Sequence, residues 1–149
     1  MNKVSCWIAP RSQVKGFSLL EVLIAVLVLS FGLLGLAGLQ MTALRSNQSA
    51  MERSMAVIES YSIVDSMRID RLNAESGAFN IGLQQTPAGT TFADNELVKW
   101  RNRLTALLGQ DATGSVSCNG TNCVIVVEWN DQRGIGGAVQ QQITTQVQL

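Results

Sequence analysis

The chain has 149 residues, and its 11 basic side chains balance 11 acidic ones. This length fits one domain of ordinary size, and a net charge of zero provides no general attraction to nucleic acid. The absence of histidine excludes Ser-His-Asp and Cys-His catalysis and all histidine-ligated metal sites. The charges are unevenly distributed, because positions 22–39 carry none. The first forty residues therefore need an explanation of their own.

A basic N-terminal stretch precedes an apolar segment that is long enough to cross a membrane. Residues 1–15 contain three basic side chains and no acidic one. The 23 residues from Phe17 to Leu39 would form a helix of about 35 Å, which exceeds the roughly 30 Å hydrocarbon core of a bilayer. The positive-inside rule places the basic stretch in the cytoplasm and the rest of the chain beyond the membrane.

Three other interpretations fit part of this pattern. A cleaved secretory signal stays open because small residues occur near the end of the run, although its apolar region is usually about 7–15 residues long. A simple signal anchor accounts for everything except Glu21. A buried core helix rarely needs so long an uncharged run. We therefore expect a helix that anchors the chain in a membrane.

Glu21 is the one charged residue between Phe17 and Leu39. An ionised side chain costs about 2.5–3.5 kcal/mol at the centre of a membrane helix and less near the interface, so it usually has a partner. The next basic residue downstream is Arg45. Cleavage between Gly16 and Phe17 would create an α-amino group four residues before Glu21, and the amine of a neighbouring subunit could equally neutralise the carboxylate. Glu21 is therefore predicted to act in assembly.

The run Gly-Phe-Ser-Leu-Leu-Glu from Gly16 to Glu21 resembles the class III signal of type IV prepilins and type II secretion pseudopilins. The resemblance implies that a prepilin peptidase removes residues 1–16 and methylates the new N-terminal Phe17. It also implies that Glu21, then the fifth mature residue, engages the N-terminus of an adjacent subunit. Residues 17–39 would be the transmembrane and filament-core helix.

One position departs from the pattern of many major pilins, which have a proline at the twenty-second mature residue. Gly38 occupies this position, and Gly32 and Gly35 precede it. Each glycine inside a helix is about 1 kcal/mol less favourable than alanine. Two interpretations stay open: close packing between helices, or a weak stretch that extends or melts when the helix enters a filament.

The helical pattern continues beyond Leu39 without proline or glycine as far as Gly77. We expect one helix from Phe17 to about Leu72, of which residues 40–72 are amphipathic and pack against a head formed by residues 73–149. The predicted packing face is an apolar stripe at helical spacing, made of Leu44, Met51, Met55, Ile58, Tyr61 and Val64.

The head is predicted to begin with an irregular connection over residues 73–93, rich in glycine and containing one proline. Asp94 is expected to cap a short helix that Gly109 ends. The apolar face of this helix would consist of Leu97, Trp100, Leu104 and Leu107. Its basic side chains are interpreted as a solvated face rather than a nucleic-acid patch, because no further basic and aromatic residues are interleaved with them: Lys99, Arg101 and Arg103.

Three strands are predicted to follow. Thr113–Cys118 and Cys123–Trp129 flank an Asn-Gly turn signal, and the alternation from Val139 to Leu149 is typical of a strand with one polar face. A small antiparallel sheet covered by the long helix results. The expected fold class is therefore α+β and pilin-like.

The three cysteines differ in their positions. Cys6 lies in the leader and would leave with it, whereas Cys118 and Cys123 flank the hairpin turn where opposed positions are close enough for a bridge. We expect a disulfide in an oxidising compartment, which the loop-entropy account values at roughly 2 kcal/mol. A zinc site would lack two ligands, and a redox-active pair is more typically spaced C-x-x-C.

The sequence contains no catalytic constellation and no phosphate-binding loop, so neither enzymatic activity nor a cofactor is expected. The resemblance implies a minor pilin of the PilV type, which primes assembly of a type IV pilus or modifies the filament or its tip. Implied partners are other minor pilins, the major pilin, the prepilin peptidase and the inner-membrane assembly platform, without nucleic acid. The subunit would span the inner membrane once with a periplasmic head and then reach the pilus surface. A minor pseudopilin of a type II secretion system is the alternative.

Overall fold

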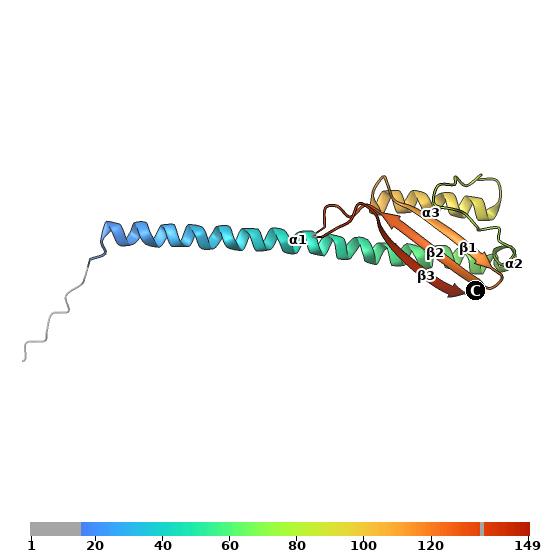
Figure 1. Cartoon of the computed structure of the whole chain (residues 1–149), viewed down its shortest axis with the longest axis horizontal. Helices are drawn as coiled ribbons and strands as arrows, with labels where there is room; N and C mark the ends of the chain where they lie inside the picture. The colour runs from blue at the N-terminus through green and yellow to red at the C-terminus, as the bar shows by residue number, and fades with distance from the viewer. Residues whose placement is uncertain (1–15, 135) are drawn as a thin grey trace, which may run out of the picture. The chain divides into compact units, whose positions relative to one another are not determined.

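A computed structural model describes residues 16–134 and 136–149. Its helices are α1 (Leu19–Ile69), α2 (Arg71–Glu75) and α3 (Phe92–Leu108), and its strands are β1 (Thr113–Asn119), β2 (Asn122–Trp129) and β3 (Gln141–Gln148) (Figure 1). The chain divides into two compact units, Met1–Leu39 and Gln40–Leu149, and α1 contributes to both. The predicted leader lies outside the described residues apart from Gly16, and this includes Cys6.

In the first unit the described residues consist of a short non-helical start and the apolar part of α1. The helix begins at Leu19, two residues later than predicted, because Ser18 caps it. The Ser18 hydroxyl accepts a hydrogen bond from the Leu20 amide at 3.3 Å, and the Ser18 carbonyl accepts one from the Glu21 amide at 3.0 Å. Within the described part of the chain, α1 is the one helix that is long and apolar enough to cross a membrane, and none of its most apolar stretch is buried.

α1 ends at Ile69, three residues before the predicted boundary near Leu72. Asp70 leaves the helical conformation with φ −119° and ψ 54°. Its carboxylate accepts hydrogen bonds from the Asn73 side-chain amide at 2.8 and 3.0 Å, which favours a turn over continued helix. The five-residue helix α2 follows at once.

The sheet is antiparallel and has three strands, as predicted, and the strand order is β1-β2-β3. β1 and β2 each extend one residue further than expected, to Asn119 and Asn122, so the hairpin loop contains only Gly120 and Thr121. Gly120 has φ +59°, a conformation that glycine adopts without steric cost at the first position of a two-residue loop. β3 begins at Gln141 rather than Val139, and Val139 is exposed.

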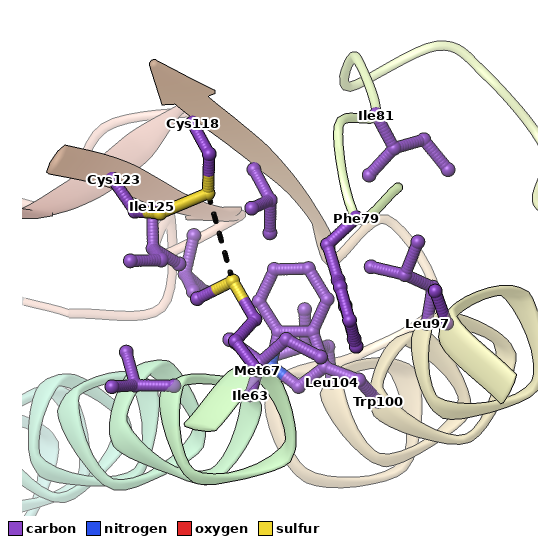
Figure 2. Packing of buried hydrophobic residues seen from close by; sticks show 14 of the residues in the cluster. Ile63, Met67, Phe79, Ile81, Leu97, Trp100, Leu104, Cys118, Cys123 and Ile125 are labelled. Atoms are coloured by element: carbon purple, nitrogen blue, oxygen red, sulfur yellow. Dashed lines mark hydrogen bonds between the residues drawn. A yellow bond between two sulfur atoms is a disulfide. The ribbon is translucent and has the colours of Figure 1, made fainter. Parts of the chain in front are cut away.

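The core of the head lies between one face of the sheet and two helices. β1 and β2 bury alternate residues, and these contact side chains from both α1 and α3 (Figure 2). Met67 of α1 reaches the Cys118 sulfur at 3.8 Å, and Trp100 of α3 is fully buried and donates its Nε1 hydrogen to the Glu59 carbonyl at 2.9 Å. This arrangement confirms the predicted α+β fold, with residues of the long helix packed on a small antiparallel sheet.

The apolar stripe predicted to face the head was wrong in most of its members. Leu44, Met51, Ile58 and Tyr61 are 69, 60, 58 and 51% exposed, Met55 is half-buried, and only Val64 is buried. The contact face instead runs along another side of α1 and consists of Ala56, Glu59, Ser60, Ile63, Val64 and Met67. The small side chains at 56 and 60 lie on this face, where they let bulky core residues approach the helix closely.

Helix α3 begins three residues earlier than predicted, because its cap is Thr91 rather than Asp94. The Thr91 hydroxyl accepts from the Asp94 amide at 3.1 Å while the Asp94 carboxylate accepts from the Thr91 amide at 3.2 Å. This reciprocal capping box satisfies two otherwise unpaired donors. The hydrogen bonds from Thr91 lower the pKa of Asp94 below its ordinary value.

The basic residues of α3 do not form the solvated face that was predicted. Arg101 donates to the main-chain carbonyls of Gly82 at 2.6 Å, Gly114 at 2.7 Å and Gln85. Arg103 pairs with the buried Glu59 of α1 at 2.9 Å. Lys99 alone behaves as expected, since it is 64% exposed and pairs with Glu96 on its own helix. The two arginines therefore fasten α3 to a loop, to β1 and to α1.

Replacing Arg103 with alanine is expected to lower the free energy of unfolding of the head by about 1–2 kcal/mol. The change leaves the Glu59 carboxylate, whose side chain is 8% exposed, without its partner, but Arg103 itself is 39% exposed and partly screened by solvent. Urea unfolding of the full chain in detergent, followed by tryptophan fluorescence, measures the loss. Lys99→Ala is the matched control and should change the midpoint little, because its ion pair is exposed.

Candidate functional site

The residues around the predicted cleavage point are accessible. Gly16, Phe17 and Ser18 precede the helix and are non-helical, and the Phe17 side chain is 83% exposed. Among the described residues, no atom beyond the immediate chain neighbours lies within 4 Å of the position that a Gly16 side chain would take. An exposed segment outside regular secondary structure is the kind of backbone that proteases bind and cut. The 16–17 peptide bond is therefore open to a processing enzyme.

Glu21 lies in the first turn of α1, four residues after Phe17. Both residues line one shallow surface hollow, together with Val22 and neighbouring apolar side chains of the same helix face. Among residues 16–134 and 136–149 the Glu21 carboxylate makes no hydrogen bond or ion pair with another side chain. A carboxylate in the first turn of a helix is also stabilised by the positive end of the helix dipole. Glu21 and Phe17, the predicted mature N-terminus, therefore line the same side of the start of α1.

The three glycines of the apolar helix are all in helical conformation. A side chain added at Gly32, Gly35 or Gly38 would meet nothing within 4 Å. The described residues of the chain itself therefore give no reason for glycine at these positions. Close packing with another helix and a weak stretch used on filament entry both stay predictions.

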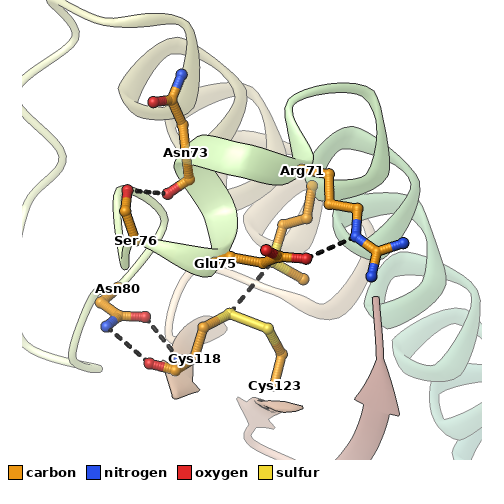
Figure 3. Close-up of a disulfide and its surroundings, with 8 residues drawn as sticks. Arg71, Asn73, Glu75, Ser76, Asn80, Cys118 and Cys123 are labelled. Atoms are coloured by element: carbon orange, nitrogen blue, oxygen red, sulfur yellow. Dashed lines mark hydrogen bonds and ion pairs between the residues drawn. A yellow bond between two sulfur atoms is a disulfide. The ribbon is translucent and has the colours of Figure 1, made fainter. Parts of the chain in front are cut away.

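The predicted disulfide joins Cys118 and Cys123 across the closed end of the β1-β2 hairpin (Figure 3). The two residues are directly paired in the sheet with their Cα atoms 4.1 Å apart. Cys118 is 9% and Cys123 1% exposed. The predicted pairing is therefore present, and the bond is buried.

A buried polar contact in the loop before β3 was not found from the sequence. Asp131 is 1% exposed and accepts a hydrogen bond from the Ser49 hydroxyl of α1 at 2.6 Å. The sequence contains one local indication of a turn at this place, the glycine three residues after Asp131. The Gly134 amide donates to the Asp131 carbonyl at 2.9 Å and closes the turn.

The described residues define a small disulfide-linked α+β head and an apolar helix that is preceded by an exposed non-helical segment. Residues 11–37 match the family described as the prokaryotic N-terminal methylation motif. No curated protein and no solved structure gives a match to the chain. The motif indicates a precursor of the type IV pilin and pseudopilin class, and the apolar helix is compatible with anchoring in a membrane.

Proposed function

We propose that the chain is a minor pilin of a type IV pilus that acts without enzymatic activity of its own. The observation that carries the proposal is a methylation motif over residues 11–37 at the head of an apolar helix, with Glu21 four residues after the expected N-terminus. The subunit would wait in the inner membrane with its head in the periplasm. It would then join other minor pilins and the major pilin at the assembly platform to prime the filament or modify its tip.

The exposed side of α1 in the head supports a role in assembly. Leu44, Met51 and Ile58 are spaced seven residues apart and are each more than half exposed. A seven-residue apolar repeat is the pattern with which one helix packs along another. Residues that the head leaves uncovered are therefore suited to helices of neighbouring subunits.

The mature N-terminus tests the proposal. Mass spectrometry of the chain purified from membranes is expected to find a polypeptide that begins at Phe17 and carries one methyl group on its α-amine. Cleavage by ordinary signal peptidase would instead produce a chain that begins near or after Leu39, and an uncleaved anchor would retain Met1. Either of these results would rule out the pilin proposal.

Sheared pili separate the pilus from the secretion alternative. A minor pilin is expected to be recovered at low stoichiometry in pili that have been sheared from cells and washed. A minor pseudopilin would begin at the same Phe17 but would be missing from these pili, and protein secretion rather than piliation would fail when its gene is deleted.

A further inference from the structure

The two edge strands of the sheet differ in whether their outward main-chain groups are hydrogen-bonded. β1 forms one edge, and groups from elsewhere in the head close it. Ile81 exchanges two main-chain hydrogen bonds with Val116, at 2.9 and 3.0 Å. The side chain of Asn80 bonds both main-chain groups of Cys118, at 2.6 and 3.2 Å (Figure 3), and Arg101 bonds the Gly114 carbonyl at 2.7 Å. The outward main chain of β1 is therefore occupied at three alternate residues.

The register shows which residues of β3 face outward. Residues 114, 116 and 118 of β1 bond outward, so residues 113, 115 and 117 bond β2, because alternate residues of an antiparallel strand direct their main-chain groups to opposite sides. On β2 this leaves Cys123, Ile125 and Val127 to bond β3, where they pair with residues 147, 145 and 143. The main-chain groups at positions 142, 144, 146 and 148 must then point to the open edge. Within the described ranges, 16–134 and 136–149, nothing bonds them.

β3 lacks the features that keep open edges from pairing. Natural sheets protect their edges with lysine, proline, bulges or inward-pointing charges. Gln141–Gln148 contains no charged residue and no proline, and it pairs with β2 over its whole length without a bulge. On the core side of the strand, Ile143 and Val147 are only half-buried although they pack against the core. The β3 edge therefore combines main-chain groups that have no hydrogen-bond partner among the described residues with the partly exposed apolar side chains of Ile143 and Val147.

We propose that the β3 edge binds an extended segment of a different protein by strand addition. The chemistry of the edge defines this segment: it carries no charge, places apolar residues beside Ile143 and Val147, and places neutral polar residues beside Thr144 and Gln146. Main-chain hydrogen bonds would provide affinity, and the alternation of side chains would fix the register. The inference goes beyond the proposed function, because the edge is open whichever filament the chain joins.

A second copy of the chain fits the edge poorly in each possible arrangement. Antiparallel pairing of two β3 strands about a twofold axis normal to the sheet would make the 40–69 segments of α1 run in opposite directions. Residue 40, which directly follows the apolar segment, would then lie at opposite ends of the pair in the two copies. Parallel pairing about an axis along the strands would place the Ile143 and Val147 side chains of one copy beside the exposed polar side chains at positions 142, 144, 146 and 148 of the other. Pairing of β3 with the β1 edge of another copy is blocked because that edge is occupied.

Amide hydrogen exchange on the full chain in detergent tests the proposal. The probe is a nine-residue peptide with the sequence of residues 141–149, which has the required alternation and lacks the anchored helix that opposes pairing. Centred on Thr145, the antiparallel register places Ile143 opposite Val147. Saturating peptide is expected to slow exchange at positions 142, 144, 146 and 148 at least tenfold. A scrambled peptide of the same composition should leave these rates unchanged.

Two substitutions at one position make the test specific for the main chain. Thr144→Pro removes an outward N–H that has no partner within the described head, so the unfolding midpoint should change little while the peptide-induced protection disappears. Thr144→Val retains the N–H and should retain the protection. The proposal is overturned if saturating peptide slows none of the four amides, if the scrambled peptide works equally well, or if Thr144→Pro still shows protection. It is also overturned if the four amides are protected without peptide and lose this protection when the chain is diluted, because a second copy then occupies the edge.

Discussion

Replacing Gly114 with alanine is expected to lower the free energy of unfolding of the head by about 3 kcal/mol, near the upper end of typical overpacking costs. Gly114 lies on the buried face of β1, opposite Val127. A methyl group there would lie 2.8 and 2.9 Å from the Cζ3 and Cζ2 atoms of Trp100, and closer still to Cη2. These distances are shorter than any carbon–carbon contact in a well-packed protein, so either the ring or the strand must move.

Trp100 has little freedom to make room for the methyl group. Its side chain is fully buried, and its Nε1 hydrogen bond to the Glu59 carbonyl holds the ring against α1. Gly114 is also tied at its own carbonyl, which accepts hydrogen bonds from Arg101. The added methyl group therefore has a high free-energy cost, because β1, α3 and α1 pack together at this position.

Gly82→Ala is the matched control for Gly114→Ala. A methyl group at Gly82 would meet only the flexible Gln85 side chain, at an ordinary contact distance of 3.5 Å. Urea unfolding of both full-length variants in detergent should show a clear fall in midpoint for Gly114→Ala and little change for Gly82→Ala. Equal midpoints for the two variants would show that the Trp100 pocket is looser than the structure indicates.

The sequence predicted the parts of the head that depend on local rules. The Asn-Gly signal and the alternation from Thr113 onward located the hairpin to within one residue, because turn chemistry and side-chain period act over short distances. The disulfide followed from the hairpin, since Cys118 and Cys123 are symmetrically placed about its loop. Helix boundaries were less accurate, because Thr91 and Asp70 act through side-chain hydrogen bonds that a hydrophobic pattern does not contain.

The side of α1 that contacts the head could not be predicted from hydrophobicity. A ranking by apolar character favours Met51, Ile58 and Tyr61, yet these side chains are exposed. The observed face contains Glu59, which pairs with Arg103 of α3 and whose carbonyl accepts the Trp100 hydrogen bond, and Ser60, whose hydroxyl donates to the Ala56 carbonyl of α1. Such contacts join residues about forty positions apart, and their effect appears only once the chain has folded.

The N-terminal motif could be recognised in the sequence because it is a short linear pattern. A processing signal is recognised as an extended stretch, so Gly16, Phe17 and the apolar run could be identified before any tertiary structure, and residues 11–37 match the methylation motif. The open edge of β3 is the opposite case. The Gln141–Gln148 sequence predicts a strand, but only the register and the closure of β1 show that its outer main chain is free.

Replacing Glu21 with alanine is expected to leave membrane insertion intact and to reduce incorporation into filaments or minor-pilin complexes at least tenfold. Insertion should not suffer, because removal of a carboxylate from an apolar helix lowers the cost of placing that helix in lipid. Incorporation should suffer because the carboxylate has no side-chain partner among the described residues and lies four residues from the expected α-amine at Phe17. In lipid an unpaired charge is unfavourable, so the attraction between this acid and the amine of a neighbouring subunit would favour the assembled state.

Glu52→Ala is the control for the loss of a carboxylate from α1. Glu52 lies outside the apolar segment and accepts a hydrogen bond from Gln48, one turn earlier on the same helix. Its removal should alter neither insertion nor incorporation. Quantitative immunoblots of membrane fractions and sheared filaments compare the two variants with the unmodified chain. If Glu21→Ala reaches filaments as efficiently as Glu52→Ala, the Glu21 carboxylate only stabilises the start of the helix through its interaction with the helix dipole. Contacts made by other parts of the subunit must then drive assembly.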